Sequence, residues 1–253
     1  MIDSDLDITA IGISDVGSTR TNNEDVWVTL PEIGFFAVAD GMGGHNAGEV
    51  AAKETIDSLV SSVKNLHKKT TLELITEIRS AIEKANRHVH EMSSQNKSYQ
   101  GMGTTLCLLM RTKEAIIHAH VGDSRVYRLR NKKLSLLTQD HSLFAKWLAT
   151  GKLAEKCETP YPYKHVITRA IGGSGKANPE IAVATLQEGD VFFLCSDGLP
   201  DVLSLTEMEE ILNDTSLLQK SAHELIEKAK IKGGSDNMTI VMVRFENAKN
   251  IFR

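Results

Sequence analysis

The sequence has few cysteines, few prolines and no stretch that resembles a linker. Its 253 residues include three cysteines and five prolines. Cys107 and Cys195 lie in apolar runs and Cys157 in a polar one, so they predict no disulfide framework and suit a reducing compartment. Because no segment is rich in proline or serine or is repetitive, nothing marks a domain boundary, and we expect a single catalytic domain over residues 1–253.

The sequence also lacks the features of membrane, secreted and nucleic-acid-binding proteins. No apolar run approaches the length needed to cross a bilayer, and the acidic segment 1–7 has no hydrophobic core, so we expect a cytoplasmic protein. A formal charge of −4 gives no basic footprint for nucleic acid. The one compact basic cluster, Lys64 with Lys68 and Lys69, lies where a helix is expected to end, a position at which the helix dipole favours cations.

The hydrophobic periodicity predicts an α+β protein. Short apolar segments between polar turns predict strands at 8–13, 26–30, 34–39, 104–110, 115–121, 125–129, 133–137, 181–185, 191–195 and 238–245. Apolar residues at helical spacing predict helices around 56–63, 75–89, 142–150, 205–212 and 217–230. Since strands come in runs and helices in pairs, antiparallel sheets are favoured over a parallel doubly wound sheet.

Acidic residues stand at the ends of many predicted strands. Apolar runs lead directly into Asp40-Gly41, Gly122-Asp123 and Ser196-Asp197-Gly198, and Glu24-Asp25 and Asp236 stand just before two other strands. Carboxylate and carbonyl oxygens are the ligands that Mg²⁺ and Mn²⁺ prefer. A glycine after the acid lets the chain turn sharply and lets a ligand approach closely. One Asp-Gly is typical of an ordinary turn, whereas the whole set indicates a site for a hard metal ion.

Motifs built around these acids follow one another along nearly the whole chain. They are Arg20-Thr-Asn-Asn-Glu-Asp25, Val38-Ala-Asp-Gly-Met-Gly-Gly-His45 with Gly48-Glu49, Gly103-Thr104-Thr105, Val121-Gly-Asp-Ser-Arg125, Thr168-Arg-Ala-Ile-Gly172, Ser196-Asp-Gly-Leu-Pro-Asp201 and Ser235-Asp-Asn-Met-Thr239. In this order they resemble the type 2C metal-dependent serine/threonine protein phosphatases, the PPM family, particularly its compact bacterial members. The resemblance implies a sandwich of two antiparallel β-sheets flanked by pairs of α-helices, with metal ions in a cleft at one end.

The resemblance also implies a metal centre with Mn²⁺ or Mg²⁺, two ions in the core and possibly a third. The matching positions are Glu24, Asp25, Asp40, Gly41, Asp123, Asp197 and Asp236. Asp40 matches the aspartate that bridges the two ions, and Gly41 matches the residue whose carbonyl binds one of them. Glu24 and Asp25 match acids that act directly or through bound water. Asp123 matches the acid of a third, weaker site, and the remaining two aspartates match ligands of the second ion.

Other residues would bind the substrate or support the ligands. A guanidinium is a two-pronged holder of phosphate oxygens, and Arg20 matches the phosphate-binding arginine of the family. Asp201 and Asn237 match supporting residues. The sequence departs from the family at Met42, where animal members often carry a histidine proposed to protonate the leaving oxygen. His45 does not align with that donor; it either lines the cleft rim or caps the following helix, and both alternatives stay open.

The implied activity is hydrolysis of phosphoserine and phosphothreonine in proteins. A metal-bridging hydroxide would attack phosphorus in line, without a covalent phosphoenzyme. One alternative is a catalytically inactive relative that acts as a binding module, which the complete set of acids disfavours. Another is a metal hydrolase of small phosphoesters or phosphotyrosine. Comparing phosphopeptides with a small phosphoester separates this alternative from the protein phosphatase.

The region 141–171 would form the flap that tunes substrate choice in this family. We hypothesise that Tyr161 and Tyr163 contact the phosphoprotein there. The expected partners are phosphorylated proteins, including a serine/threonine kinase or its substrates, and we expect a monomer that binds neither nucleic acid nor membrane. His118 and His120 alternate along a predicted strand, and we interpret them as packing residues rather than metal ligands.

Overall fold

The structure is a computed structural model that describes residues 6–43, 47–64, 66, 69–113, 115–150, 165–173, 175–214 and 217–247. Its strands are β1 (Leu6–Asp15), β2 (Asp25–Leu30), β3 (Phe35–Met42), β4 (Gly103–Thr104), β5 (Leu106–Arg111), β6 (Ala115–Val121), β7 (Arg125–Arg130), β8 (Lys133–Leu136), β9 (Glu180–Thr185), β10 (Val191–Cys195) and β11 (Met238–Asn247). Its α-helices are α1 (Gly48–Val63), α2 (Thr71–Gln95), α3 (Leu143–Ala149), α4 (Leu205–Asp214) and α5 (Leu218–Ile231), with short 3₁₀ helices at Pro31–Ile33 and Lys97–Tyr99. The predicted strands and helices are confirmed, with ends that differ by a few residues, except that the one strand expected over 104–110 is divided at Thr105 into β4 and β5.

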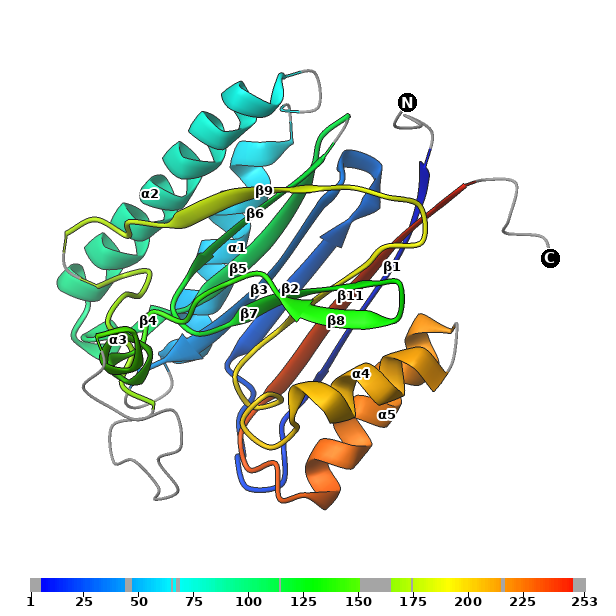
Figure 1. Ribbon diagram of the computed structural model, residues 1–253. Helices are drawn as coiled ribbons and strands as arrows, with labels where there is room; N and C mark the ends of the chain where they lie inside the picture. The colour runs from blue at the N-terminus through cyan, green and yellow to red at the C-terminus, as the bar shows by residue number, and fades with distance from the viewer. Residues whose placement is uncertain are drawn as a thin grey trace.

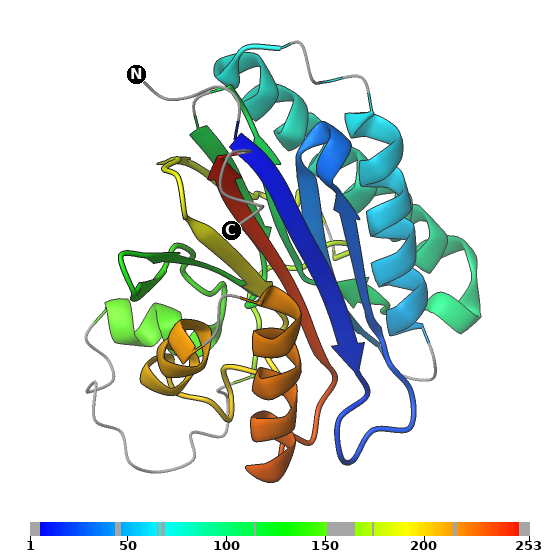
Figure 2. The ribbon, with the colours of Figure 1, turned by 90° about the vertical axis from the view of Figure 1, so that its right-hand side faces the viewer.

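These elements form two antiparallel sheets between two pairs of helices (Figure 1). One sheet has the order β1-β11-β10-β7-β8, and the other has the order β2-β3-β5-β6-β9 with β4 paired to β3. Helices α1 and α2 cover the outer side of the second sheet, and α4 and α5 cover the first, as Figure 2 shows from the side. The predicted α+β sandwich is therefore confirmed.

The nearly continuous apolar strands follow from burial on both faces of each sheet. In β3, Phe35 points into the core beneath α1 and α2, while Phe36 points into the core between the sheets. In β10, Phe193 packs toward α4 and α5, and Phe192 packs between the sheets. Successive side chains of a strand point to opposite faces, so a strand buried on both sides needs apolar residues at every position.

The antiparallel register brings the acidic strand ends to one end of the sandwich. The first residue of β2, Asp25, pairs with Asp40 near the end of β3. Cys195, the last residue of β10, pairs with Ile240 close to the start of β11, so Asp197 and Asp236 lie just beyond the same pair of strand ends. Strands that are far apart in sequence thus deliver their acids to a common place.

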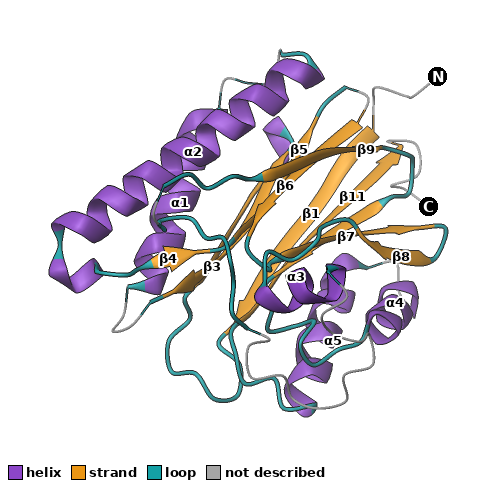
Figure 3. Ribbon diagram, turned by 60° about the vertical axis from the view of Figure 1, so that its left-hand side comes forward, coloured by secondary structure: helices purple, strands orange, loops and turns teal. Residues whose placement is uncertain are grey.

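One local prediction is wrong. We expected the chain to turn at Asp40-Gly41, but β3 continues to Met42, with Gly41 and Met42 paired to β4 (Figure 3). Gly41 is needed for close packing instead, because a Cβ atom there would overlap the carbonyl oxygen of Gly48 at the start of α1. Asp40 therefore stands on a hydrogen-bonded strand rather than in a flexible turn.

The described part of the expected flap contains α3 and residues 165–171. Helix α3 confirms the predicted helix at 142–150, and the Ser142 hydroxyl accepts a hydrogen bond from Ala145 N at 3.1 Å as its N-cap. The proposed contacts of Tyr161 and Tyr163, and the alternatives for His45, lie outside the described residues. Among the helices that are described, none has the length and apolar character that crossing a membrane requires.

Candidate metal centre

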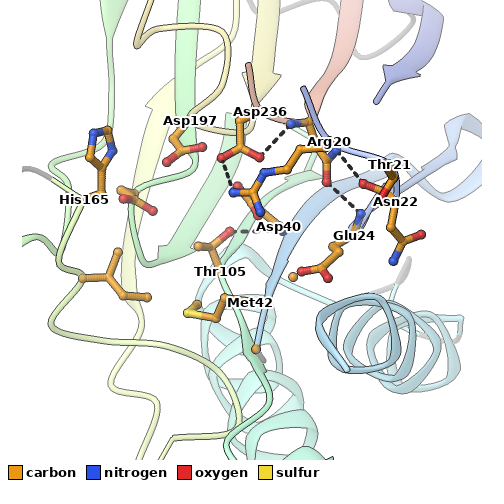
Figure 4. Close-up of a pocket in the computed structure, with 15 residues that line it drawn as sticks. Arg20, Thr21, Asn22, Glu24, Asp40, Met42, Thr105, His165, Asp197 and Asp236 are labelled. Atoms are coloured by element: carbon orange, nitrogen blue, oxygen red, sulfur yellow. Dashed lines mark hydrogen bonds and ion pairs between the residues drawn. The ribbon is translucent and has the colours of Figure 1, made fainter. Parts of the chain in front are cut away.

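A polar cavity of about 420 Å³ opens at the end of the sandwich where the acids meet (Figure 4). The structure brings most of the predicted site residues to its wall, namely Arg20, Glu24, Asp40, Gly41, Asp123, Asp197, Asp236 and Asn237. Asp25 and Asp201 lie just outside this wall. Thr105, His165 and Ile167 also line the cavity, although no role at the site was assigned to them from the sequence.

The backbone of Asp40 is fixed by two threonines of the Gly103-Thr104-Thr105 motif. The carbonyl oxygen of Asp40 accepts hydrogen bonds from the Thr104 hydroxyl and from Thr105 N, each at 2.8 Å. Asp40 N donates to the Thr105 hydroxyl oxygen at 3.2 Å. Because the main-chain groups are satisfied by neighbouring strands, the carboxylate is held at a defined place in the cavity wall. These hydrogen bonds explain how the two threonines support the site.

Asn237 fixes the loop that carries Arg20. Its side-chain oxygen accepts from Glu24 N at 2.8 Å, and its amide nitrogen donates to the carbonyl oxygens of Val16 and Asn22, each at 3.0 Å. Arg20 Nη2 in turn contacts Asp236 Oδ2 at 2.8 Å. A guanidinium has five N–H donors, so Arg20 can hold a carboxylate and still bind phosphate oxygens.

Asp25 lies buried behind the cavity wall and is incompletely bonded. Its Oδ2 accepts a hydrogen bond from the Ser196 hydroxyl at 2.8 Å, and that hydroxyl accepts from Thr239 N at 3.0 Å. Its Oδ1 has no hydrogen-bond partner among the described residues. Burying a carboxylate oxygen without a partner is costly. This orphaned acceptor is therefore well suited to bind a cation or a water molecule held by one.

The pKa values of the acids also indicate a site for a cation. Burial first, and then the neighbouring Asp197 charge, raise the pKa of Asp123 to about 7. Burial followed by nearby carboxylates raises the pKa values of Asp25 and Asp197 to about 6, and the same causes raise the pKa of Asp40 well above its usual range. Like charges so close together disfavour ionisation, and a divalent cation among them reverses this effect. An all-oxygen donor set fits Mg²⁺ or Mn²⁺.

His165 joins the cavity from the described end of the flap. Its Nδ1 lies 3.3 Å from Asp201 Oδ2, and possible ligand atoms of His165, Asp197 and Asp201 all lie within 4.8 Å of one another. Asp201 N also donates to the carbonyl oxygen of Asp197 at 3.0 Å, which supports the turn after β10. Sequence patterns around residue 165 are weak, so only the tertiary structure places this histidine at the site.

A second cluster lies beside the metal centre and combines two buried histidines with an exposed ion pair. Possible ligand atoms of His120, His141 and Glu180 lie within 4.8 Å of one another. Arg169 Nη1 is 3.0 Å from His141 Nε2 and 3.3 Å from Glu180 Oε1. The cluster therefore already contains a cation supplied by the chain. His118 and His120 are both buried on β6, as expected for packing residues.

The fold together with a carboxylate-lined cavity defines the class of metal-dependent protein phosphatases, and the comparison with solved structures agrees. The structure matches the Streptococcus agalactiae serine/threonine phosphatase with a TM-score of 0.89 and 34% identity, covering 94% of this chain and 100% of that one. It also matches the catalytic domain of the phosphatase PstP, solved in complex with 2 manganese ions, with a TM-score of 0.85 and 31% identity, covering 96% of this chain and 100% of that one.

Sequence comparison gives the particular family. The pattern of the family described as Protein phosphatase 2C matches residues 18–230, so the chain belongs to this family. It is 37% identical over 234 residues to the serine/threonine phosphatase stp of Listeria monocytogenes, covering 91% of this chain and 93% of the relative. It is 33% identical over 238 residues to the protein phosphatase PhpP of Streptococcus pneumoniae, covering 91% of this chain and 95% of the relative. The resemblance inferred from the motifs is confirmed.

Proposed function

We propose that this protein is a metal-dependent protein phosphatase that hydrolyses phosphoserine and phosphothreonine. The observation that carries this proposal is the convergence of Asp40, Asp197 and Asp236 with Arg20 around one cavity. Family membership and the serine/threonine phosphatases among its relatives support the activity. The two manganese ions of PstP support Mn²⁺ or Mg²⁺ as the cofactor.

Each acid has a proposed place in the metal centre. Asp40 would bridge two ions, with the Gly41 carbonyl on one of them and Asp197 and Asp236 on the other. Glu24 would act directly or through water at the cavity wall, and the buried Asp25 through water from behind it. Asp123 would hold a third ion. When bound, such ions supply an acidified water molecule and neutralise the charge of the phosphate.

The residues of the chain would then bind and orient the substrate. Arg20 would hold two phosphate oxygens in a planar fork, which aligns phosphorus for in-line attack by water. Since water attacks directly, no protein side chain becomes phosphorylated. Met42 faces the cavity and has no proton to donate, so the leaving oxygen would receive its proton from elsewhere.

The rest of the chain would serve this one site. We propose that residues 1–253 form a single catalytic domain with a flap at 141–171, and that the protein acts as a monomer on phosphoproteins, including a serine/threonine kinase or its substrates. The site reads phosphate through metal ions and Arg20. The surface around the cavity, including the flap, would then select the protein substrate.

The proposed function is tested by hydrolysis of a phosphothreonine peptide with Mn²⁺, with EDTA, and by Asp40→Asn. We expect turnover that depends on Mn²⁺ and is lost in both controls. A phosphotyrosine peptide and a small chromogenic phosphoester are assayed in parallel, and faster turnover of either would favour a less selective hydrolase. A folded protein that binds Mn²⁺ but hydrolyses none of the substrates would point to a binding module.

A further inference from the structure

We propose that His141 is a positioning residue that holds the Gly122-Asp123 turn and thereby sets the affinity of the metal position at Asp123. The inference rests on the proposed function, since it takes Asp123 as a ligand. His141 does not touch the cavity itself. It acts through the backbone of Gly122, the residue directly before this acid.

Two hydrogen bonds connect His141 to the turn. His141 N donates to the carbonyl oxygen of Gly122 at 2.9 Å, and Gly122 N donates to His141 Nδ1 at 3.2 Å. Gly122 has a φ of +102°, and a Cβ atom there would lie 2.8 Å from the side chain of Thr105. A backbone conformation of this kind needs support from its surroundings. The buried His141 side chain provides it from directly beneath the turn.

The hydrogen bonds set the roles of the two ring nitrogens. A backbone N–H can only donate, so Nδ1 of His141 accepts from Gly122 N and the proton of a neutral ring lies on Nε2. Glu180 Oε1 lies 3.2 Å from Nε2 and 3.3 Å from Arg169 Nη1, and it accepts from both groups. Nε2 and Nη1, which are 3.0 Å apart, are therefore two donors to one carboxylate rather than partners of each other. An ion on Nε2 would force the ring proton onto Nδ1, against the Gly122 N–H, which argues against His141 as a metal ligand.

Other contacts hold the ring and its neighbour in place. The His141 ring stacks on the His120 ring with centroids 4.4 Å apart. The adjacent Asp140 forms a two-pronged ion pair with Arg125, at 2.9 Å and 2.6 Å, on the other side of Asp123. Residues 140 and 141 thus contact the chain on both sides of Asp123, at Arg125 and at Gly122. Such contacts are suited to holding the Asp123 carboxylate in place.

His141 also connects the turn to the flap. Its carbonyl oxygen accepts hydrogen bonds from Thr168 N at 2.6 Å and from the Thr168 hydroxyl at 3.0 Å. Thr168 directly follows Ile167, which lines the cavity. The metal position at Asp123 and the cavity-facing end of the flap therefore share one support.

Two conservative variants separate the functions of the ring. The amide of asparagine lies near the position of Nδ1, so His141→Asn can keep an acceptor for Gly122 N. The amide of glutamine lies near Nε2, so His141→Gln can keep the donor to Glu180 but loses that acceptor. His118→Gln is the matched control, because His118 is a buried histidine on the face of β6 that also carries His120, and it makes no hydrogen bond to the turn.

The measurement is calorimetric titration of metal-free protein with Mn²⁺, with Asp123→Asn as the reference for the site at Asp123. We expect His141→Gln to weaken the Asp123-dependent binding about 10-fold, as loss of an outer partner of a metal ligand typically does. The Mn²⁺ affinity of His141→Asn should be closer to that of the wild type, and the affinity of His118→Gln should equal that of the wild type. Hydrogen exchange at the peptide containing Gly122 should become faster in His141→Gln than in His141→Asn.

The outcomes distinguish the inference from the proposed function. Wild-type Mn²⁺ binding in His141→Gln, beside impaired binding in Asp123→Asn, would overturn the inference alone. Wild-type binding in Asp123→Asn would remove Asp123 from the metal centre and would overturn both. If His141→Gln does not fold, the His141→Asn variant tests the inference instead. Should folded His141→Asn bind Mn²⁺ as weakly as Asp123→Asn does, an acceptor at the position of Nδ1 would not be what positions the turn, and the inference would be overturned.

Discussion

Two polar clusters lie side by side in this protein, one of carboxylates around the cavity and one in which the buried His120 and His141 meet the exposed ion pair of Glu180 and Arg169. They differ in where their counter-charge comes from. Around the cavity, burial and then neighbouring carboxylates raise the pKa values of Asp25, Asp40 and Asp197, and Asp25 Oδ1 lacks a partner among the described residues. In the second cluster, Arg169 neutralises Glu180 and the histidines pair with backbone groups. The first cluster is incomplete without an external cation, and the second is complete. Incompleteness of this kind indicates a ligand site.

The strongest way to break this comparison is to remove the acid at the centre of the first cluster. We expect Asp40→Asn to lower kcat at least about 10³-fold, because the position proposed to bridge two metal ions loses its charge, which weakens metal binding and with it the stabilisation of the developing negative charge. The measurement is phosphopeptide turnover at saturating Mn²⁺.

The matched control is Asp190→Asn. Asp190 is also buried, but its Oδ2 pairs with Arg130 Nη2 at 2.6 Å, so its counter-charge lies within the chain. This variant should lower the free energy of unfolding by leaving Arg130 unpaired, while the folded fraction keeps its kcat. Equal losses of kcat in the two variants would mean that buried aspartates matter here only for stability.

The next largest expected effect is the increase in the free energy of unfolding when a metal ion binds. A metal ion that binds only the folded state should add about 2.7 kcal/mol to the free energy of unfolding at a hundred times its Kd. Denaturant titration with Mn²⁺ and with EDTA measures this difference.

Asp197→Asn sharpens the same test. The variant should lose most of the gain from Mn²⁺, yet its metal-free form should be at least as stable as the wild type, because one of the mutually repelling carboxylates is gone. A metal-free Asp197→Asn protein that is clearly less stable than the wild type would contradict the view of this cluster as electrostatically strained.

Much of the fold followed from the sequence because strands such as β3 and β10 are buried on both faces. Val191-Phe-Phe-Leu-Cys195 has no polar position, and its length and flanking turns allow only a short buried strand. The continuation of β3 through Asp40 and Gly41 could not be predicted in the same way. It depends on pairing with Gly103 and Thr104, more than sixty residues later, and no local pattern records that partner.

The candidate site, like strand β3, depends on contacts between distant parts of the chain that local sequence patterns do not record. The acidic strand ends identified the residue types, but their convergence is a property of strand register, and only the family resemblance implied it before the structure was known. His165 had no local signal. The motif containing Thr105 was recognised, but its position in the cavity wall arises because its hydroxyl and amide bind the backbone of Asp40.

A smaller effect is expected at Arg20, which lies in the cavity wall. Arg20→Ala should lower kcat/KM by about 10- to 100-fold, mainly through KM, because it removes a charge-assisted fork to phosphate. Arg20→Lys should recover only part of this loss, since an ammonium group is a point charge without the planar fork. Steady-state kinetics with a phosphopeptide measures both.

Arg79→Ala is the control for this experiment, because Arg79 Nη1 donates to the carbonyl oxygen of Pro179 at 3.2 Å, away from the cavity wall. An Arg79→Ala protein with wild-type kinetics would show that the loss in Arg20→Ala reflects the site. If Arg20→Lys matched the wild type, a point charge would suffice and the proposed fork would be wrong.

The smallest effect concerns His118, a buried neighbour of His120 on β6, whose titration has the opposite sign to that of the acids. Burial, followed by the charges of His120 and Arg128, lowers the pKa of His118 from 6.5 to about 4. A histidine that binds protons more weakly when folded stabilises the protein above its unfolded pKa, and this stability is lost as pH falls toward the folded pKa. The carboxylates with raised pKa values do the reverse: their contribution is lost as pH rises through about 6.

The difference between wild type and His118→Gln isolates the histidine contribution from that of the acids. Between pH 7 and pH 6, the wild type should lose up to about 1 kcal/mol more of its free energy of unfolding than His118→Gln does. Urea titrations in EDTA at the two pH values measure this, with the metal site free in both proteins so that the carboxylate contribution cancels. Parallel pH dependence in the two proteins would mean that the pKa of His118 is the same in the folded and unfolded states, so that burial on β6 does not disfavour its charged form.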